Sequence, residues 1–395
     1  MKIVKPTYYD EFQCTASKCP ITCCQEWKIS VDDETYKKWK SLTPPDTMKT
    51  RKKELKAFTT YKDNVCIIGL GKGHRCPFLN ADKLCNIVSA YGDDKIPETC
   101  RVFPREIHEY HTRTEYSLMP CCPEVVDMLN RLKRFEIVEV DEEKEEKTSF
   151  LTEEGYLRIR DFFCDMAQKE ENTPEKNLLM IYFMALDILH SGFMRDDMEA
   201  AEYLVAMEHY TDKGMLKELS EGVDKLQFED RDAFQERNEL LLDIAENYRK
   251  EGLYRPYLDE ITLYAEELTQ NYNAIDLNRE TVTFWKAFEE YRPLMRKLLA
   301  AEIYADSMLP DGNMITIVTK LQWLAMEFTV ICHILFLHWV KHKELPYEKV
   351  RDTIVIISRM MGYEEEDVTE YLKNSFEKLI WDFGYFAMIV GNGES

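Results

Sequence analysis

The chain has 395 residues, of which 45% are hydrophobic and 12% aromatic, enough to build substantial cores and to argue against disorder. Acidic residues outnumber basic residues by 73 to 51, so the net charge is −22. A surface this acidic argues against a nucleic-acid partner and favours a cationic partner such as an exposed lysine. The length suggests two or three domains.

The first residues, Met1–Pro6, lack the apolar stretch of a secretory signal peptide, so we expect a cytoplasmic protein. Structural disulfides are rare in that reducing compartment. Ten of the twelve cysteines nevertheless fall within the first 122 positions, among turn signals such as those at 43–46 and 69–73. In a large cytoplasmic chain, such a dense group indicates metal binding or catalysis.

The spacing of these cysteines indicates a metal site. Four of them lie within eleven residues, and Cys-Pro pairs recur at 19–20, 76–77 and 122–123. Thiols so close in sequence converge only where the chain loops tightly, and a metal supplies the reason because it binds thiolates and lowers thiol pKa values. The spacing lacks the paired Cys-x2-Cys knuckles of common zinc sites, whereas iron–sulfur clusters accept more variable spacing. Zinc and iron–sulfur both remain open.

A run of charged residues, Asp141–Lys147, predicts an exposed linker or helix end. We therefore place a cysteine-rich metal- or iron–sulfur-binding domain at residues 1–140 and an all-helical domain at residues 151–395. The expected fold class is mainly α, with an irregular Cys-rich metal-binding N-terminal domain followed by an all-helical C-terminal domain.

Helical patterns fill the second region. Thr173 and Pro174 form a favourable helix start, because a capping hydroxyl precedes proline at the first helical position. Further helices are predicted over residues 278–305, 313–341, 346–361 and 364–385. The most apolar stretch, Lys320–Lys341, includes two histidines, a glutamine and a glutamate, which would be costly in lipid. It predicts a buried core helix and no membrane partner.

The cysteine motifs also carry a family resemblance. In chain order they are Cys14…Cys19…Cys23-Cys24, Cys76-Pro-Phe-Leu, Leu84-Cys-Asn-Ile, Glu98-Thr-Cys-Arg followed by Phe103-Pro-Arg, and Cys122-Pro-Glu. This order resembles the flagellin lysine-N-methylases, which belong to a wider group of zinc- or iron-chelating proteins named for a CxxCxxCC motif. The resemblance is specific over residues 8–127. It implies methyl transfer from S-adenosylmethionine to lysine side chains of flagellin in a bacterial cytoplasm.

The resemblance also implies a ligand set and cofactors. Eight cysteines match the family pattern as metal ligands: Cys14, Cys19, Cys23, Cys24, Cys76, Cys85, Cys100 and Cys122. They could form two four-cysteine sites, or one site with spare thiols. The expected centre is an iron–sulfur cluster of the [4Fe–4S] type, with zinc as the alternative, and the expected methyl donor is S-adenosylmethionine.

The other cysteines lie outside this set. Cys66 and Cys121 do not match the motifs, and Cys164 and Cys332 are expected to be buried small apolar residues of helices. Arg101 and Arg105, which flank Cys100, are candidate donors to the carboxylate of the cosubstrate, or counter-charges to thiolates. The sequence offers no catalytic base.

Two other functions fit the same residues: a non-catalytic metal-chelating scaffold that binds a partner, and an iron–sulfur redox carrier. A sulfonium methyl group is already activated, so polar transfer to a deprotonated lysine needs positioning and desolvation but no metal. A cysteine-held centre could therefore brace the fold or bind the cosubstrate directly.

Overall fold

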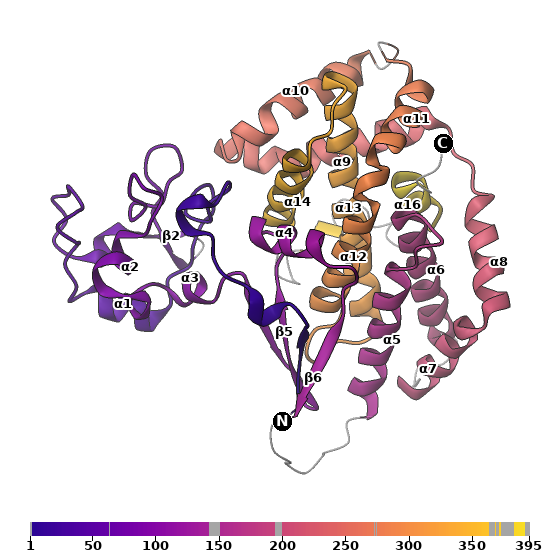
Figure 1. Cartoon of the computed structure of the whole chain (residues 1–395), viewed down its shortest axis with the longest axis horizontal. Helices are drawn as coiled ribbons and strands as arrows, with labels where there is room; N and C mark the ends of the chain where they lie inside the picture. The colour runs from indigo at the N-terminus through magenta and orange to yellow at the C-terminus, as the bar shows by residue number, and fades with distance from the viewer. Residues whose placement is uncertain are drawn as a thin grey trace.

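The structure is a computed structural model, and it describes residues 2–62, 64–141, 151–193, 200–271, 273, 275–362, 368, 371–372 and 383–391. Figure 1 shows a small part built of short helices and strands beside a larger body of long helices. We call residues 24–104 the cysteine lobe, residues 7–23 the neck, and the larger part the helical body. The expected fold class, mainly α with a cysteine-rich N-terminal part, is confirmed.

A four-stranded sheet ties the N-terminal region to the helical body. Its strands, in spatial order, are β4 (Arg105–Glu109), β5 (Arg113–Leu118), β1 (Lys2–Pro6) and β6 (Ile137–Asp141). β1 runs parallel to β5 and antiparallel to β6, so the beginning of the chain lies inside the sheet. Val4 is fully buried in the core of the body. The cysteine lobe is therefore an excursion of the chain between β1 and β4.

The cysteine lobe has its own small core. Its elements are α1 (Asp33–Trp39), η3 (Leu55–Phe58), β2 (Thr59–Lys62), β3 (Val65–Ile68), α2 (Asn86–Tyr91), η4 (Asp93–Lys95) and α3 (Glu98–Val102). Asp32 caps α1 by accepting a hydrogen bond of 2.8 Å from the Thr35 amide. Trp39 is fully buried against Phe78, with ring centroids 5.3 Å apart. This core is separate from the core of the body.

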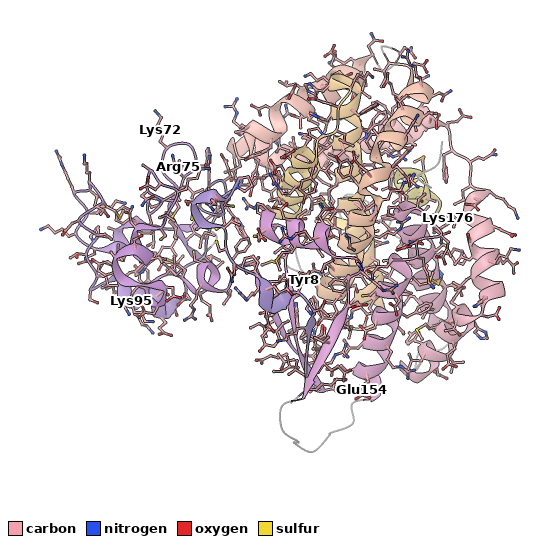
Figure 2. All side chains as sticks on the ribbon, viewed as in Figure 1. Tyr8, Lys72, Arg75, Lys95, Glu154 and Lys176 are labelled. Carbon is pink, nitrogen blue, oxygen red and sulfur yellow. The ribbon has the colours of Figure 1, made fainter. Side chains whose placement is uncertain are left out.

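The neck carries two short 3-10 helices, η1 (Tyr9–Glu11) and η2 (Ala16–Lys18). Figure 2 shows Tyr8 where the lobe meets the body, and Lys72, Arg75 and Lys95 out on the lobe. Tyr8 is buried in the body's core. The neck is thus anchored to the body at its first residues and leads from there into the lobe.

The helical body surrounds one long central helix, α13. Its helices are α4 (Pro123–Arg131), α5 (Leu151–Ala167), α6 (Pro174–Phe193), α7 (Ala200–Glu208), α8 (Lys213–Asp224), α9 (Asp230–Glu251), α10 (Arg255–Gln270), α11 (Leu277–Phe288), α12 (Arg292–Asp306), α13 (Met314–His342), α14 (Tyr347–Met361) and α16 (Phe383–Val390), with the 3-10 turns η5 (His209–Thr211) and η7 (Glu289–Tyr291). Among the described residues, α13 alone is long and apolar enough to cross a membrane, yet 89% of its most apolar window is buried by protein. Its apolarity therefore reflects its place in the core, as the sequence predicts.

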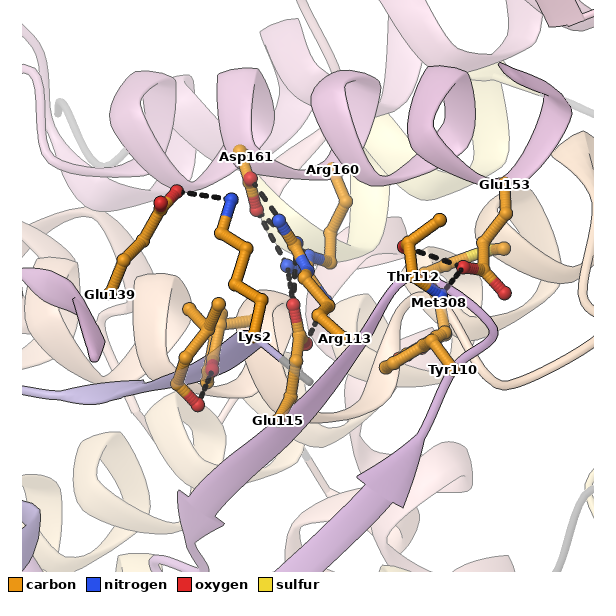
Figure 3. Close-up of polar contacts among 12 residues, drawn as sticks. Lys2, Tyr110, Thr112, Arg113, Glu115, Glu139, Glu153, Arg160, Asp161 and Met308 are labelled. Carbon is orange, nitrogen blue, oxygen red and sulfur yellow. Dashed lines mark hydrogen bonds and ion pairs between the residues drawn. The ribbon is translucent and has the colours of Figure 1, made fainter. Parts of the chain in front are cut away.

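A buried charge network fixes the sheet to the body (Figure 3). Arg160 of α5 is completely buried and donates to both carboxylate oxygens of Glu115 on β5, at 2.5 and 2.9 Å. Asp161 accepts a further bond of 2.6 Å from Arg160, and the ring of Tyr304 on α12 lies 4.7 Å from the guanidinium. A buried arginine needs such partners, because an unpaired buried charge is costly.

Most of the helix predictions that the structure describes are confirmed. Helix α6 begins at Pro174, and α13 and α14 lie within one residue of the predicted 313–341 and 346–361. The helical region predicted over 278–305 consists of two helices, α11 and α12, joined by η7. Pro293, at the start of α12, lacks the amide that a continuous helix requires.

Other predictions lie partly or wholly beyond the described residues. Residues 142–147 of the charged run and most of 364–385 belong to this group. The division into domains at 1–140 and 151–395 stays a prediction. The structure adds that β1, β4–β6 and α4 pack with the helices, through residues such as Leu118 and Val125.

Candidate metal centre

Backbone pairing places three cysteines of the cysteine lobe in neighbouring positions. The Cys76 amide donates to the Cys24 carbonyl oxygen at 2.8 Å, so these two residues lie side by side. Residues 76–79 form a tight turn in which the Leu79 amide donates to the Cys76 carbonyl, and Leu79 bridges to Cys85. Cys100 lies on α3. Burial raises the pKa of its thiol, and the charges of the other three thiols, which lie nearby, raise it further. We call Cys24, Cys76, Cys85 and Cys100 the lobe group.

Backbone amides point at the sulfurs of the lobe group. The amides of Phe78 and Leu79 lie against Cys76, and those of residues 87 and 88 lie against Cys85. Burial raises the pKa of Cys76 to about 12, and these amides oppose that rise. Amide donors favour the thiolate form over the thiol. The amides of these turns therefore stabilise the thiolate forms of Cys76 and Cys85, although burial of the sulfurs favours the neutral thiols.

Three further cysteines gather at the neck. Cys19 is close enough to both Cys14 and Cys122 for their charges to interact, and the Ala16 amide donates to the Cys14 sulfur at 3.4 Å. Cys122 precedes α4, where the Glu124 and Val125 amides point at its sulfur; burial raises its pKa to about 11. We call Cys14, Cys19 and Cys122 the neck group.

Cys23 lies beside the lobe group. Its thiol donates a hydrogen bond to the Cys24 sulfur, which raises the pKa of Cys23 and lowers that of Cys24. The charge of Cys100 also acts on it. The eight cysteines of the predicted ligand set thus fall into the lobe group, the neck group, and Cys23 beside the lobe group.

Arg359 of α14 joins the neck to the body. It is 6% exposed, and its guanidinium donates to the carbonyl oxygens of Cys121 (2.9 Å), Ile21 (2.9 Å) and Thr22 (3.4 Å). Its charge favours the ionised forms of five thiols: Cys19, Cys23, Cys24, Cys121 and Cys122. A buried arginine whose donors are held by carbonyls is a fixed positive charge beside both groups. No motif in the sequence marks this residue.

The donor set fits a thiolate-bound metal. Every cysteine is a free thiol, so the thiols are not joined as disulfides. Amides and Arg359 favour thiolates, and a metal cation would offset the burial that opposes them. Within the described part of the chain, however, no three Cys, His, Asp or Glu side chains stand together as a ready-made metal site. The ligand assignment therefore stays a prediction.

The two predicted arginines occupy different settings. Arg101 on α3 is 51% exposed in its side chain and pairs with Glu98 at 3.4 Å. Arg105 on β4 lies over the ring of Phe12, 4.9 Å from the centroid. Arg101 is open to a ligand from solution, whereas Arg105 is packed at the neck. Their assignment to the cosubstrate is not tested by these contacts.

A group of buried carboxyls lies in the body close to Cys121, and no sequence pattern predicts it. Glu302 of α12 and Glu327 of α13 lie against each other, and Ser358 of α14 donates to Glu327 at 2.6 Å. Burial raises the pKa of Glu327 to about 7, and burial also raises the pKa of Glu302, with the neighbouring Glu327 and Asp306 adding to the rise. Such a pair retains a proton that exposed carboxyls would lose. Glutamates on separate helices carry no shared sequence pattern.

Comparisons with known proteins agree with this arrangement. A zinc- or iron-chelating domain, named CxxCxxCC, matches residues 13–118. "Flagellar biosynthetic protein FliU" of Salmonella muenchen is 28% identical over 138 residues, which are 32% of this chain and 76% of that protein. Proteins named "Lysine-N-methylase" from Salmonella typhimurium and Salmonella choleraesuis are each 29% identical over 138 residues.

These matches differ in how much of each protein they cover. The matched segment covers only 32% of either lysine-N-methylase. No solved structure matches the chain. The profile of the FliB lysine N-methylase C-terminal domain, in contrast, matches residues 160–389, which is more than half of the chain and most of the helical body. The chain therefore belongs to the FliB lysine N-methylase family.

Proposed function

We propose that this protein transfers methyl groups from S-adenosylmethionine to lysine side chains of flagellin in the bacterial cytoplasm. The observation that carries the proposal is the match of the helical body to the FliB lysine N-methylase C-terminal domain, in a chain whose cysteine lobe is docked on that body. The name of the FliU relative, a flagellar biosynthetic protein, supports a flagellar substrate. The net charge of −22 suits a lysine-bearing partner.

We further propose that the thiols hold an iron–sulfur cluster of the [4Fe–4S] type, with zinc as the alternative. The lobe group supplies four cysteines, the number that both centres require. When bound, the metal would supply positive charge that stabilises the buried thiolates. The neck group, with Cys23, would hold a second centre or remain as spare thiols.

Methyl transfer places two demands on the chain's own residues. The lysine nitrogen must lose its proton, since its ordinary pKa of about 10.4 keeps it charged at neutral pH. The methyl donor must also be held in a site that excludes water and aligns the sulfonium with the nitrogen. Apolar walls with a few fixed polar groups meet the second demand.

The direct test incubates purified flagellin with the anaerobically prepared protein and S-adenosylmethionine. We expect the mass of flagellin to rise in steps of about 14 Da, and only when S-adenosylmethionine is present. The absorbance of the same preparation near about 400 nm would separate an iron–sulfur cluster from zinc. Failure of methylation by fully metallated protein would contradict the proposal and favour a metal-chelating scaffold or, with a redox-active cluster, an electron carrier.

A further inference from the structure

A cavity of about 600 Å³ lies in the helical body. Helices α6, α8, α9, α11, α13 and α16 line it, together with the segment that joins α8 to α9. None of the eight cysteines of the predicted ligand set is among its lining residues. Its volume falls within the range of roughly 300–1,000 Å³ that is usual for small-molecule sites. The sequence does not reveal this cavity, because the residues that line it resemble ordinary core residues of helices.

One part of the cavity wall is aromatic. Phe234 of α9, Phe284 and Trp285 of α11, and Phe336 of α13 line it. The rings of Phe284 and Phe336 meet edge to face, 5.5 Å apart. Aromatic walls offer a flat base a surface for stacking, and their faces attract cations such as a sulfonium.

Arg237 of α9 supplies a positive charge to the cavity. Its Nε donates to the Ile389 carbonyl at 2.6 Å and its Nη2 to the Met388 carbonyl at 3.3 Å, so the side chain is fixed at the end of α16. Both of these hydrogen bonds go to main-chain oxygens, and the carboxylates of Asp230 and Glu175 lie near enough for their charges to act on the guanidinium. Burial lowers the pKa of this guanidinium. A carboxylate in the cavity would relieve that cost by pairing with it.

The wall also holds a polar group that has no partner within the described part of the chain. Thr329 of α13 is 2% exposed and lines the cavity, and its hydroxyl has no hydrogen-bond partner among the described residues. Buried hydroxyls are normally satisfied, so an unpaired one indicates a missing partner such as a ligand or water. His333 beside it is already satisfied, since it lies 2.7 Å from the Asn238 side-chain oxygen, and burial lowers its pKa to about 3. The histidine is therefore neutral and fixed.

The charge of the lining matches one kind of ligand. Glu229 and Asp230 at the start of α9 and Arg237 are the lining residues that carry charge at neutral pH, with a sum of −1. S-adenosylmethionine carries one carboxylate, one ammonium and one sulfonium, so its charge is opposite. Arg237 suits the carboxylate, the two acidic residues suit the ammonium, and the aromatic walls suit the adenine and the sulfonium.

We infer that this cavity binds S-adenosylmethionine, with Arg237 receiving its carboxylate and the aromatic walls its adenosyl group. The inference rests on the proposed function, which supplies the ligand. It places the methyl donor in the FliB-type helical body and assigns the thiol-bound metal to bracing the lobe. A donor bound directly to a metal held by the thiols is the opposite outcome.

The test measures binding of S-adenosylmethionine to the full-length, anaerobically purified protein by calorimetric titration. Thr281→Trp on α11 fills the cavity from a half-buried position, and we expect it to weaken binding about tenfold or more. Val282→Trp is the matched control, because the neighbouring residue is 51% exposed and lies outside the cavity. Arg237→Lys keeps the charge but loses the fork geometry, and we expect a weakening of about three- to tenfold.

The remaining arms separate this inference from the proposed function. Hydrogen exchange should show that S-adenosylmethionine protects the amides of residues 226–237 and 277–288, and does not protect those of residues 14–24 or 76–100. Arg101→Ala and Arg105→Ala should bind as the unaltered protein does. If Thr281→Trp and Arg237→Lys bind normally while the protein methylates flagellin, the inference is wrong and the function stands. If the protein neither binds S-adenosylmethionine nor methylates flagellin, both are wrong.

Discussion

The cysteine lobe and the helical body are packed very differently. The core of the lobe consists of a few residues around Trp39 and Phe78, and its helices have at most seven residues. The body has one continuous core, and α13 alone runs for 29 residues. A core as small as that of the lobe seldom stabilises a fold without a metal or a covalent link. The comparison predicts that the lobe depends on a metal bound by its thiols, whereas the body depends on apolar packing.

Metal removal should affect the two regions unequally, and it is the largest effect that we expect. A structural metal contributes about 10 kcal/mol or more to the folding of a small domain. Chelation of the anaerobically purified protein should therefore abolish amide protection across residues 24–104 and leave α6 and α13 protected. Hydrogen exchange with mass spectrometry measures both regions at once. If the amides of the lobe are equally protected before and after chelation, the lobe does not depend on a bound metal.

Single cysteine substitutions sharpen the same comparison. Cys100→Ala or Cys23→Ala should lower the metal content per chain, because each removes a thiol from the predicted ligand set. Cys332→Ala in the body is the matched control and should retain the full metal content. Elemental analysis of the three variants is the measurement. Equal metal content in all of them would contradict the ligand assignment.

The sheet belongs to the body, and Glu115→Ala tests that attachment. The change leaves Arg160 buried without its main partner, which costs about 3–5 kcal/mol. Denaturant unfolding should show that loss. Glu139→Ala removes an exposed partner of Lys2 on the same sheet and should cost at most about 1 kcal/mol. Equal losses in the two variants would mean that the buried network does not hold the sheet.

Arg359→Met tests the joint between the regions. It leaves three carbonyl oxygens of the neck and of Cys121 without their donor, and we expect a loss of about 2–4 kcal/mol. Exchange of amides at residues 14–24 should accelerate more than exchange within α13. Arg101→Met, at an exposed position of the lobe, is the control and should change little. If amide exchange in the neck is the same in Arg359→Met as in the unaltered protein, Arg359 does not hold the neck to the body.

Glu327→Gln tests the polar interior of the body and is the smallest expected effect. Its pKa is raised to about 7, so folding binds a proton, and stability falls as the pH rises from about 4.5 through about 7. Glutamine still accepts the Ser358 hydrogen bond and carries no charge. The variant should therefore be more stable than the unaltered protein at pH 8, by about 1–3 kcal/mol, and similar at pH 4. If the free energy of unfolding of Glu327→Gln follows the same pH dependence as that of the unaltered protein, Glu327 does not take up a proton on folding.

The long helices could be predicted from the sequence because their signals are local. Pro174 after a capping threonine marks the start of α6, and the apolar run of α13 has a length that fits a core helix. The sheet could not be predicted, because β1 has five residues and pairs with strands more than 100 positions away. Register across such a distance leaves no local pattern.

The candidate site could be predicted only in part for a similar reason. The cysteine motifs predict which thiols belong to the ligand set. Their division into lobe and neck groups depends on backbone pairing, such as that of Cys76 with Cys24, which the motifs do not show. The cavity could not be predicted, because Arg237 and Thr329 resemble ordinary helix residues in the sequence. Their importance arises from their place in the cavity wall, which the sequence does not show.

The position of Arg359 has a consequence for biosynthesis. The ribosome makes Cys24 335 residues before it makes the arginine whose guanidinium reaches Ile21 and Thr22. At about 5–20 residues per second, that interval lasts roughly 20–70 s. During it the nascent neck has no latch, so its sulfurs are exposed to whatever the surrounding medium supplies. Binding of a metal ion by the thiols and attachment of the neck by Arg359 are consequently separate events, and metal binding can come first.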